Sequence, residues 1–538
     1  MLTKKITILL SCVLAYHANI AAAQPDSLLL RDYTFMKQSD PWFNSPNAAA
    51  LTRFTYQNMA QAELSLSGEK GGFSNYNGSD DATLVQANVE SFYRYNQRTV
   101  FFGSMSYENF SGRHMGGSAF INPDRKPFDL VEDSLTNQGT KHRDTYALSG
   151  GVGSRVTDNL SIGARIDYTS ANMAKYKDLR HQNKLMDLQL SGSVYADITS
   201  WFSLGAYYMH HRNTESITFG KYGTSDKVYK TLVSYANFTG HLEQFGQEGY
   251  TDKSREMPLV NNNNGGGIQF SIHDSQTFLY TDLMYTQGWG YYGQKSPYTI
   301  TYSNHNSEKY QWQVSLIDKS STTAVYRIDM CFSHHKMQND ATTHRELKNA
   351  SGATYYEYYT PVKNADRIWQ DFSIGYTIHT GIRQAIPTWT IQASMAWMER
   401  QQTAYIFPFY RRQTLNCYSP SVFLCHNIIA KHGVWGFTLN GSFLQGEGKP
   451  YEDFTFQKPS DKQPAPPSMD AYLYREYQWL TAAQYHIGGQ LKYAFIWPNT
   501  KLKMHALLNI DHHKANESTN YSNGCRHTIV TAAIGCEF

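Results

Sequence analysis

The pattern that decides the fold is clearest in residues 160–168, which read Leu-Ser-Ile-Gly-Ala-Arg-Ile-Asp-Tyr. Every second residue is apolar or aromatic, and the residues between them are small, polar or charged. Successive side chains of a β-strand point to opposite faces, so this stretch predicts a strand with one apolar and one polar face. The same alternation returns in residues 389–397 and 435–443.

The length of these stretches separates a membrane barrel from a soluble sheet protein. Alternation runs for about ten residues at a time, whereas strands of soluble proteins average about five or six. Tight and long connections take turns between the stretches, as in bacterial outer-membrane barrels with short periplasmic turns and long external loops. The sequence therefore predicts an all-β fold, a transmembrane antiparallel β-barrel of about 18 strands.

Strands are predicted at 59–69, 83–95, 98–109, 144–154, 159–169, 185–197, 201–212, 265–273, 276–286, 308–318, 322–335, 367–379, 388–400, 411–427, 432–445, 480–496, 500–513 and 525–538. The stretch at 411–427 is the least regular and is the one expected to break. Because the number of strands is even, both ends of the barrel are expected in the periplasm. The long loops 110–143, 213–264, 336–366 and 446–479 are then expected outside.

The first residues have the form of an export signal. Met1 to Lys5 is positively charged, Ile6 to Ala15 is mostly apolar, and the small residues Ala21 to Ala23 follow. This order predicts a secretory signal peptide over residues 1–23, cleaved near Ala23. A lipidation site at Cys12 is the alternative, but the apolar run before it is too short. Residues 24–58 are expected to stay in the periplasm or enter the lumen, and residues 59–538 to form the barrel.

Composition excludes several other classes of protein. The chain has 40 tyrosines and 27 phenylalanines, only 17% charged residues, and a net charge of +3. No stretch after the leader approaches the roughly 20 apolar residues of a spanning helix. The near-neutral charge gives no sign of nucleic-acid binding. No cofactor is expected.

The cysteines and tryptophans fit a membrane wall. The odd, scattered set of cysteines beyond the leader has no C-x-x-C pair, so it predicts neither a disulfide scaffold nor a zinc site. These cysteines are expected to face the membrane, and one disulfide among them is the alternative. They are Cys331, Cys417, Cys425, Cys525 and Cys536. Aromatic residues near the short turns predict a periplasmic girdle: Trp201, Trp389, Trp435 and Trp497. A second set lies toward the long loops: Tyr168, Tyr208, Tyr285, Trp312 and Trp397.

The end of the chain carries a further barrel signal. From Val530 to Phe538 every second residue is apolar, and the last residue is aromatic. This ending resembles the terminal-strand signal that the barrel-assembly machinery of outer membranes recognises. Phe538 is therefore expected to face lipid and act as the assembly signal, and Glu537 to lie on the opposite face.

The polar faces of the strands describe the lumen. A barrel this wide cannot be filled by side chains alone, so the lumen is expected to hold water or a plug. Mixed charges predict internal ion pairs in a hydrated bore. The expected lumen-facing residues are Gln86, Asn88, Glu90, Glu108, Arg165, Asp167, Gln189, Gln311, Gln313, Arg327, Asp329, Gln490, Lys492 and Lys503.

Histidines raise the possibility of a metal site. Alternation turns a set of metal-binding side chains toward the lumen: His211, His335, His505, Asp511 and His513. Imidazole and carboxylate suit Zn²⁺, Cu²⁺ or Ni²⁺, although interfacial histidines are the ordinary alternative. No enzyme is expected, because Asp511-His512 and Ser333-His334 are adjacent pairs whose side chains point to opposite faces.

Several segments resemble one family across most of the mature chain. They are Asp40-Pro41-Trp42, the loop 68–81, Phe92-Tyr93, Gly103 and Lys177-Asp178-Leu179-Arg180. These residues are similar to an uncharacterised family of outer-membrane barrels from Bacteroidota. Residues 40–48 also resemble the N-terminal segment of fatty-acid-type channels, whose barrels have fewer strands.

The resemblance implies a role in nutrient or metal acquisition, because genes of the family tend to neighbour TonB-dependent receptors and surface lipoproteins. The expected function is a channel or accessory component for solute uptake. Docking of a surface lipoprotein or TonB-dependent receptor on the loops is the main alternative. Clusters at 177–181 and 458–464 could contact a lipoprotein or lipopolysaccharide, or remain solvated. Expected partners also include outer-membrane lipid and the barrel-assembly machinery.

Overall fold

The computed structural model describes residues 32–132, 137–224, 226–246, 257–296, 299–430, 433–498, 500, 502–516 and 521–537. The leader predicted over residues 1–23 and the assembly signal at Phe538 lie outside the described residues. No helix in the described part of the chain is long and apolar enough to cross a membrane.

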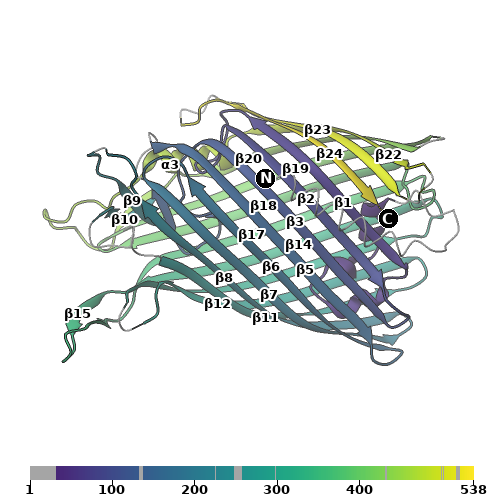
Figure 1. The fold of residues 1–538 in the computed structure, drawn as a ribbon, viewed down its shortest axis with the longest axis horizontal. Coiled ribbons are helices and arrows are strands. Elements are labelled where there is room, and N and C mark those ends of the chain that lie inside the picture. The colour runs from purple at the N-terminus through teal and green to yellow at the C-terminus, as the bar shows by residue number, and fades with distance from the viewer. Residues whose placement is uncertain are drawn as a thin grey trace.

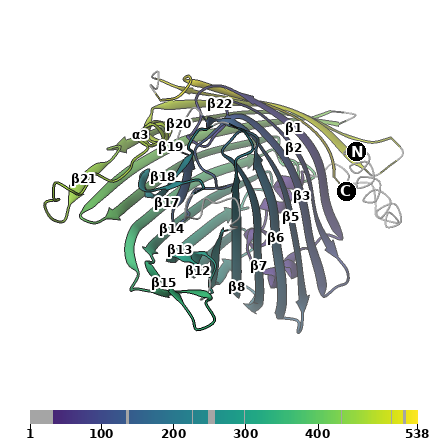
Figure 2. The same ribbon diagram turned by 60° about the vertical axis from the view of Figure 1, so that its left-hand side comes forward.

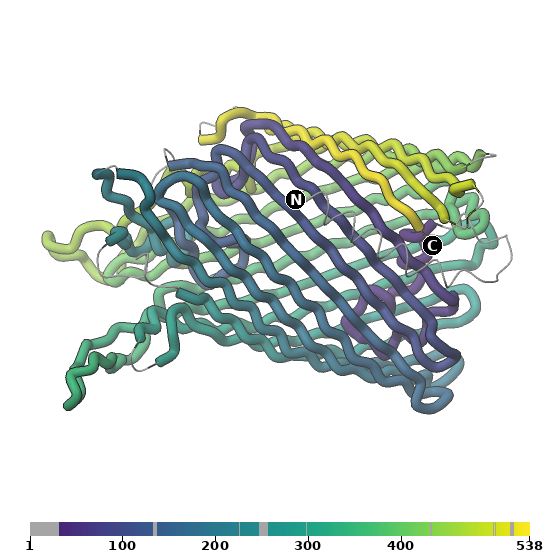
Figure 3. The backbone as a smooth tube through the Cα atoms, in the orientation of Figure 1, coloured from purple at the N-terminus to yellow at the C-terminus, as the bar shows by residue number. Residues whose placement is uncertain are grey.

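The wall is a closed antiparallel barrel of 18 strands (Figures 1 and 3), as the sequence predicts. The strands are β1 (Asn58–Lys70), β2 (Asp81–Arg94), β3 (Thr99–Met115), β5 (Gly139–Arg155), β6 (Leu160–Lys175), β7 (Arg180–Thr199), β8 (Phe202–Gly220), β11 (Met257–His273), β12 (Thr277–Gly293), β13 (Thr301–Asp318), β14 (Ala324–Ala341), β17 (Val362–Thr380), β18 (Trp389–Ile406), β19 (Phe409–Ala430), β20 (Gly433–Gly448), β22 (Gln484–Ile496), β23 (Lys503–Ala515) and β24 (Arg526–Glu537). β1 pairs with β24 from Gln61–Glu537 to Lys70–Thr528. Closure leaves no lipid-exposed strand edge with unpaired backbone groups.

The strands differ from the predicted ones mainly at their loop ends. β8 continues to Gly220 and β11 begins at Met257, both beyond the predicted 201–212 and 265–273. In the extension of β8 the outward residues Thr214, Ser216 and Thr218 are polar, so the apolar alternation that reveals a strand fades. Two further predictions were wrong, one about where a strand begins and one about a break within another strand. The predicted strand 480–496 begins only at Gln484, because residues 480 and 481 end a helix.

The expected break in 411–427 is absent, because β19 runs without interruption over Phe409–Ala430. Pro420 pairs with Met395 of β18, whereas the ladder to β20 passes over Ser419 and Pro420. Proline has no N–H to donate, so the strand tolerates it at this unpaired position.

The outward face is apolar, and its aromatic residues lie in two belts. Trp201, Trp389, Trp435 and Trp497 are all exposed beside the short turns. Tyr208, Tyr285 and Trp312 are exposed toward the other end of the wall. Rings of this kind favour the boundary between lipid and water.

The long connections carry structure of their own at the end opposite the short turns. β4 (Asp129–Glu132), β9 (Lys230–Ala236) and β10 (Thr239–Gln244) form a small three-stranded sheet. A hairpin of β15 (His344–Lys348) and β16 (Thr354–Tyr358) projects away from the barrel (Figure 1). The last long loop contains β21 (Glu452–Thr455), which pairs with β19, and α3 (Asp470–Thr481) (Figure 2).

The expectation that the cysteines face the membrane was wrong for three of them. Three cysteines lie on the lumen face: Cys331, Cys417 and Cys425. Cys331 is the cross-strand neighbour of Gln313, and Cys425 is that of Thr438. The Cys417 thiol donates a hydrogen bond to the Leu480 carbonyl. These strands place small residues on both faces, so residue size did not identify the side. The cysteines of the described chain are all free thiols.

Candidate functional site

The residues before β1 form a compact segment inside the short-turn end of the barrel (Figure 1). It consists of α2 (Tyr33–Gln38), η2 (Pro41–Asn44) and η3 (Ala48–Arg53). Asp32, Asp40 and Asn47 cap these three turns by accepting hydrogen bonds from backbone N–H groups. Such caps satisfy the free donors at the start of a helix. We call residues 32–54 the N-terminal plug.

Three glycines of the wall make room for this plug. A Cβ atom at Gly163 would lie 2.2 Å from the Ala49 nitrogen, and one at Gly153 would lie 2.4 Å from the Ala48 oxygen. A Cβ atom at Gly205 would lie 2.7 Å from the Asn47 amide nitrogen. All three glycines therefore allow a close approach that any other residue would block. The wall and the plug are shaped for each other.

Hydrogen bonds join the plug to this side of the wall. The Asn47 side-chain amide donates to the Val194 carbonyl and to Gln269 Oε1, both at 2.9 Å. The Ala49 N–H donates to Ser193 Oγ at 3.0 Å. These contacts are buried, so each lost partner would leave a polar group without water or protein.

An aromatic anchor and a hydroxyl pair continue the same contact. Trp42 is fully buried, and its ring lies 5.0 Å from both Tyr195 and Tyr280 in edge-to-face contacts. Thr52 Oγ1 lies 2.9 Å from Ser161 Oγ near the periplasmic ends of the strands.

The plug also reaches the opposite part of the wall. Glu90 accepts hydrogen bonds from the Tyr33 hydroxyl at 2.5 Å and from Lys37 Nζ at 2.8 Å. The Phe35 ring lies 5.0 Å from His379 of β17, and Arg327 of β14 donates to the Gln38 carbonyl. The plug thus crosses the periplasmic mouth from β17 to β8.

A polar cavity of about 390 Å³ remains between the plug and the wall. It lies beside β1 and β2, where the carboxylates of Glu63 and Glu90 and the ammonium of Lys37 line it. The N-terminal plug therefore narrows the periplasmic mouth and leaves beside it a cavity lined by charged side chains.

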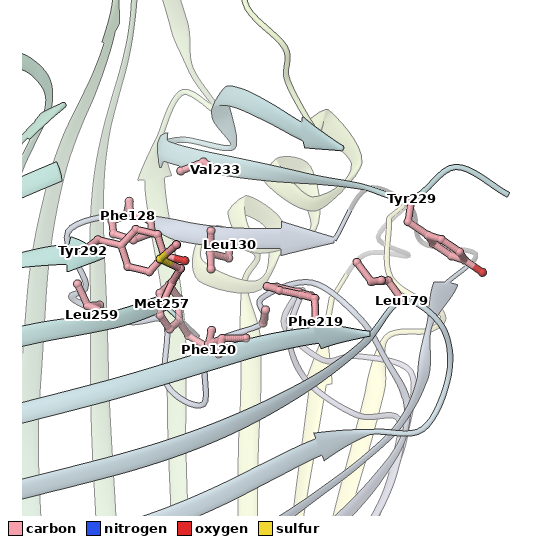
Figure 4. Close-up of a cluster of buried hydrophobic side chains, with 12 residues drawn as sticks. Phe120, Phe128, Leu130, Leu179, Phe219, Tyr229, Val233, Met257, Leu259 and Tyr292 are labelled. Atoms are coloured by element: carbon pink, nitrogen blue, oxygen red, sulfur yellow. The ribbon is translucent and has the colours of Figure 1, made fainter. Parts of the chain in front are cut away.

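Inward-folded loops cover the other mouth. The sheet of β4, β9 and β10 packs through an apolar cluster onto lumen-facing residues of β8, β11 and β12 (Figure 4). Within this cluster the Phe128 ring lies 4.8 Å from Tyr292, and Leu130 and Leu259 are fully buried. We call residues 116–132 and 229–244 the outer cap.

Buried charges fix the outer cap to the wall. Glu215 of β8 is fully buried and accepts hydrogen bonds from Lys126 Nζ at 2.7 Å, the Ile121 N–H at 2.8 Å and the Asn183 amide at 2.7 Å. A buried carboxylate is tolerated only when paired in this way. This cluster is a latch between the cap and strands β7 and β8.

A second polar cluster joins the cap to β5, β6 and the loop after β1. Burial raises the pKa of Asp129, although the hydroxyls of Ser118 and Tyr76 donate to its carboxylate at 2.5 and 2.8 Å. Its neighbour Glu132 pairs with Lys175 and lies 3.4 Å from Lys141.

The cap is held on the far wall as well. Arg367 of β17 donates to the Tyr235 carbonyl at 2.6 Å, and the Asn237 amide donates to the Gln402 carbonyl at 3.1 Å. Tyr472 of α3 packs on Phe238 with ring centroids 6.4 Å apart. The cap therefore spans the outer mouth as the plug spans the periplasmic one.

All eight charged residues predicted for the lumen point inward, and each of them forms an ion pair. Arg165 pairs with Asp167 at 2.8 Å, and Arg327 with Asp329 at 2.6 Å. The remaining contacts are Glu108–Arg143 at 3.7 Å, Lys492–Glu537 at 3.6 Å, Lys503–Glu537 at 2.7 Å and Glu90 with the plug.

The predicted metal ligands also face inward, but they lie in separate places. His211 contacts Asp187 at 2.9 Å, and His335 stacks on Trp369 at 5.1 Å. His505 lies 3.0 Å from Glu63 near the periplasmic mouth. Asp511 and His513 lie near the outer end of β23, where the His513 ring packs at a tilt against the His486 ring with centroids 4.0 Å apart. Within the described ranges, no three His, Cys, Asp or Glu side chains converge on a metal position.

Sequence reasoning missed both the plug contacts and the latch. Glu215 falls beyond the predicted end of its strand. The alternation pattern therefore did not assign its side chain to either the lumen or the membrane face. The lumen glycines carried a signal, since Gly153, Gly163 and Gly205 occupy positions in the polar face of their strands.

The loop 177–181, considered as a contact for lipoprotein or lipopolysaccharide, is tied to the molecule itself. Burial alone would raise the pKa of Asp178, but the hydrogen bonds that its carboxylate accepts from the N–H groups of Tyr222 and Gly223 help to lower the pKa overall. Leu179 is buried in the apolar cluster of the cap.

Comparison with solved structures finds other transmembrane barrels. The ferric preacinetobactin receptor BauA from Acinetobacter baumannii has 7% identity and a TM-score of 0.40, with 89% of this chain and 80% of that chain covered. The outer membrane transporter YddB from Escherichia coli has 6% identity and a TM-score of 0.42, with 90% and 81% covered. The toluene transporter TbuX from Ralstonia pickettii has 11% identity and a TM-score of 0.28, with 92% and 93% covered.

Similarities this low carry no argument about function, and the barrel fold rests on the strand pairing itself. No curated protein matches the chain. A family model does match residues 48–538, which include the whole barrel and the end of the plug. The chain belongs to DUF6850, a family of unknown function.

Proposed function

We propose that this protein is a gated, non-enzymatic channel for solute uptake across the outer membrane. The observation that carries the proposal is the plug on its glycine cradle: Gly153, Gly163 and Gly205 admit a segment that crosses the periplasmic mouth of a polar lumen. A wide barrel needs such a filling to stay sealed at rest. The plug is held by hydrogen bonds and ring contacts rather than by strand pairing, so it can leave without opening the wall.

Planar-bilayer conductance tests this proposal. The wild-type barrel should conduct rarely, whereas removal of residues 32–54 should produce stable open steps. The matched control replaces the β15–β16 hairpin by two glycines. This hairpin ends where the Tyr359 N–H donates to the Thr343 carbonyl, and it projects away from the plug. Its removal should leave conductance unchanged.

A silent barrel in all three forms, folded by its mobility in unheated gels, would reject the channel. Docking of a partner on the loops would then be the better proposal. One observation favours that alternative. The exposed rings of Phe407, Phe454 and Phe456 lie near Tyr410 on the outward face of the β18–β19 extension. Exposed apolar patches of this kind mark contact surfaces.

A further inference from the structure

The lipid-facing wall is hollowed where β8, β11, β12 and β13 run side by side. A groove of about 540 Å³ crosses β8, β11, β12 and β13 on the outward face, and its volume falls in the range of about 300–1,000 Å³ found for ligand sites. Ala206 and Gly266 contribute to its floor, and Ile268, Leu283, Tyr285 and Trp312 stand around it. The floor is low because Gly266 has no side chain on this face, whereas its neighbours Gly265 and Gly267 face the lumen.

The sides of the groove are held in position. Tyr285 and Tyr310 are cross-strand partners with ring centroids 4.9 Å apart. The Trp312 indole N–H donates to Thr281 Oγ1 at 2.9 Å. With this donor satisfied, the indole can lie in lipid without an unpaired polar group. The groove is therefore a shaped surface rather than a gap between mobile side chains.

The groove does not open into the lumen. Behind it, the Tyr207 ring occupies the space where a Cβ atom of Gly267 would lie, and the Tyr207 hydroxyl donates to Asp282 at 3.2 Å. β11 pairs without interruption with β8 and β12 along this stretch. A molecule in the groove would thus be a resident of the membrane face and not one in transit through the wall.

The outward residues of β8 change in character along the strand. From the short-turn end they are Leu204, Ala206, Tyr208, His210 and Arg212. The order is apolar, small, aromatic, polar and cationic, which follows the profile of a lipid from acyl chain to headgroup. Arg212 lies four residues beyond Tyr208, about 13 Å along the strand.

Charge at the top of the groove favours an anionic headgroup. Arg212 is exposed on the outward face, and His210 Nδ1 lies 2.7 Å from Asn264 Oδ1 beside it. At the same level Glu308 stands opposite Lys336 in the β13–β14 ladder, so those two charges offset each other. Arg212 therefore leaves a net positive charge, and arginine pairs well with phosphate.

We propose that this groove binds one acyl chain of a phosphorylated glycolipid of the outer leaflet, with Arg212 contacting a phosphate of its headgroup. The apolar sides of the groove and its floor at Gly266 hold the acyl chain. Tyr208, Tyr285 and Tyr310 lie at the junction with the headgroup. The site is independent of the proposed channel, because the wall behind it is closed.

The test is native mass spectrometry of the detergent-solubilised barrel titrated with monophosphoryl lipid A. Ala206→Trp, which fills the groove, should weaken binding about tenfold or more. Arg212→Gln should weaken it several-fold and leave binding of a glycolipid without phosphate unchanged. Ala164→Trp is the matched control, because Ala164 is exposed on the lipid face of β6 away from the groove. This variant should bind as the wild type does.

Equal binding by the wild type and Ala206→Trp would overturn the proposal, as would equal losses in Ala206→Trp and Ala164→Trp. If Ala206→Trp instead dissociates a dimer of the wild type, a second copy covers the groove and the lipid proposal is also wrong. Arg212→Gln changes an exposed side chain and keeps the test valid if the tryptophan variant does not fold.

Discussion

At the scale of single residues, the plug depends on the absence of one carbon atom. Gly163→Ala would place a Cβ atom 2.2 Å from the Ala49 nitrogen, so the plug must move away from the wall. Overpacking of this kind costs about 1–3 kcal/mol. We expect more frequent channel openings in planar bilayers. Gly192→Ala is the control, because nothing lies within 4 Å of its Cβ position, and it should behave as the wild type does.

The latch of the outer cap gives a second prediction at this scale. Glu215→Ala leaves Lys126 and the Asn183 amide without their buried partner, a change that costs about 3–5 kcal/mol. Amide hydrogen exchange should therefore quicken in residues 119–132 while residues 48–53 stay protected. The exposed pair Arg345–Glu357 is the control, since Arg345→Ala should cost at most about 1 kcal/mol. Unchanged exchange in Glu215→Ala would mean that the apolar cluster alone holds the cap.

At the scale of elements, the sequence predicted the strands where lipid meets one face and water the other. β18 is an example, because Trp389, Ile391 and Met395 alternate with polar residues and identify both faces. The same physics explains what could not be predicted. β4 and β9 are buried on both faces and lie at distant positions in the chain. Their sequences therefore show no alternation of apolar and polar residues from which the pairing could be predicted. The plug was expected only as a segment, because many of the wall residues that hold it lie far away in the chain, such as Gln269, which is 222 residues after Asn47.

The last strand carries a prediction of its own. Alternation extended beyond Glu537 predicts that Phe538 faces lipid, so Phe538→Asp should sharply lower the fraction of heat-modifiable barrel. The loss should exceed the roughly 1.5–3 kcal/mol of one buried ring, because β24 closes the barrel against β1. Glu537→Gln, whose side chain keeps an acceptor for Lys503 at 2.7 Å, should lower that fraction much less. Equal losses would mean that the two faces of β24 are exchanged.

At the scale of the whole molecule, the two ends of the barrel have different roles. The cap is fixed by buried ion pairs around Glu215 and an apolar cluster, whereas the plug rests on glycines of the wall, hydrogen bonds, apolar packing against Phe92 and the half-buried Lys37–Glu90 ion pair. A tag at Lys458–Gln463 should be reachable on intact cells, and a tag at Asn96–Gln97 should not. Both positions are exposed in the barrel, so only the membrane separates them. The reverse result would invert the orientation and move the plug to the cell surface.

A reversible lock tests whether movement of the plug is the gating step. Thr52 Oγ1 and Ser161 Oγ lie 2.9 Å apart, so Thr52→Cys with Ser161→Cys, in a background with the native cysteines replaced by serine, should form a disulfide. The oxidised protein should slow the swelling of liposomes in arabinose, and dithiothreitol should restore it. The matched pair Arg345→Cys with Glu357→Cys joins facing residues of the projecting hairpin and should have no effect. Equal swelling of the locked and reduced forms would show that solute passes without movement of the plug, and the gate would then have to be sought in the outer cap.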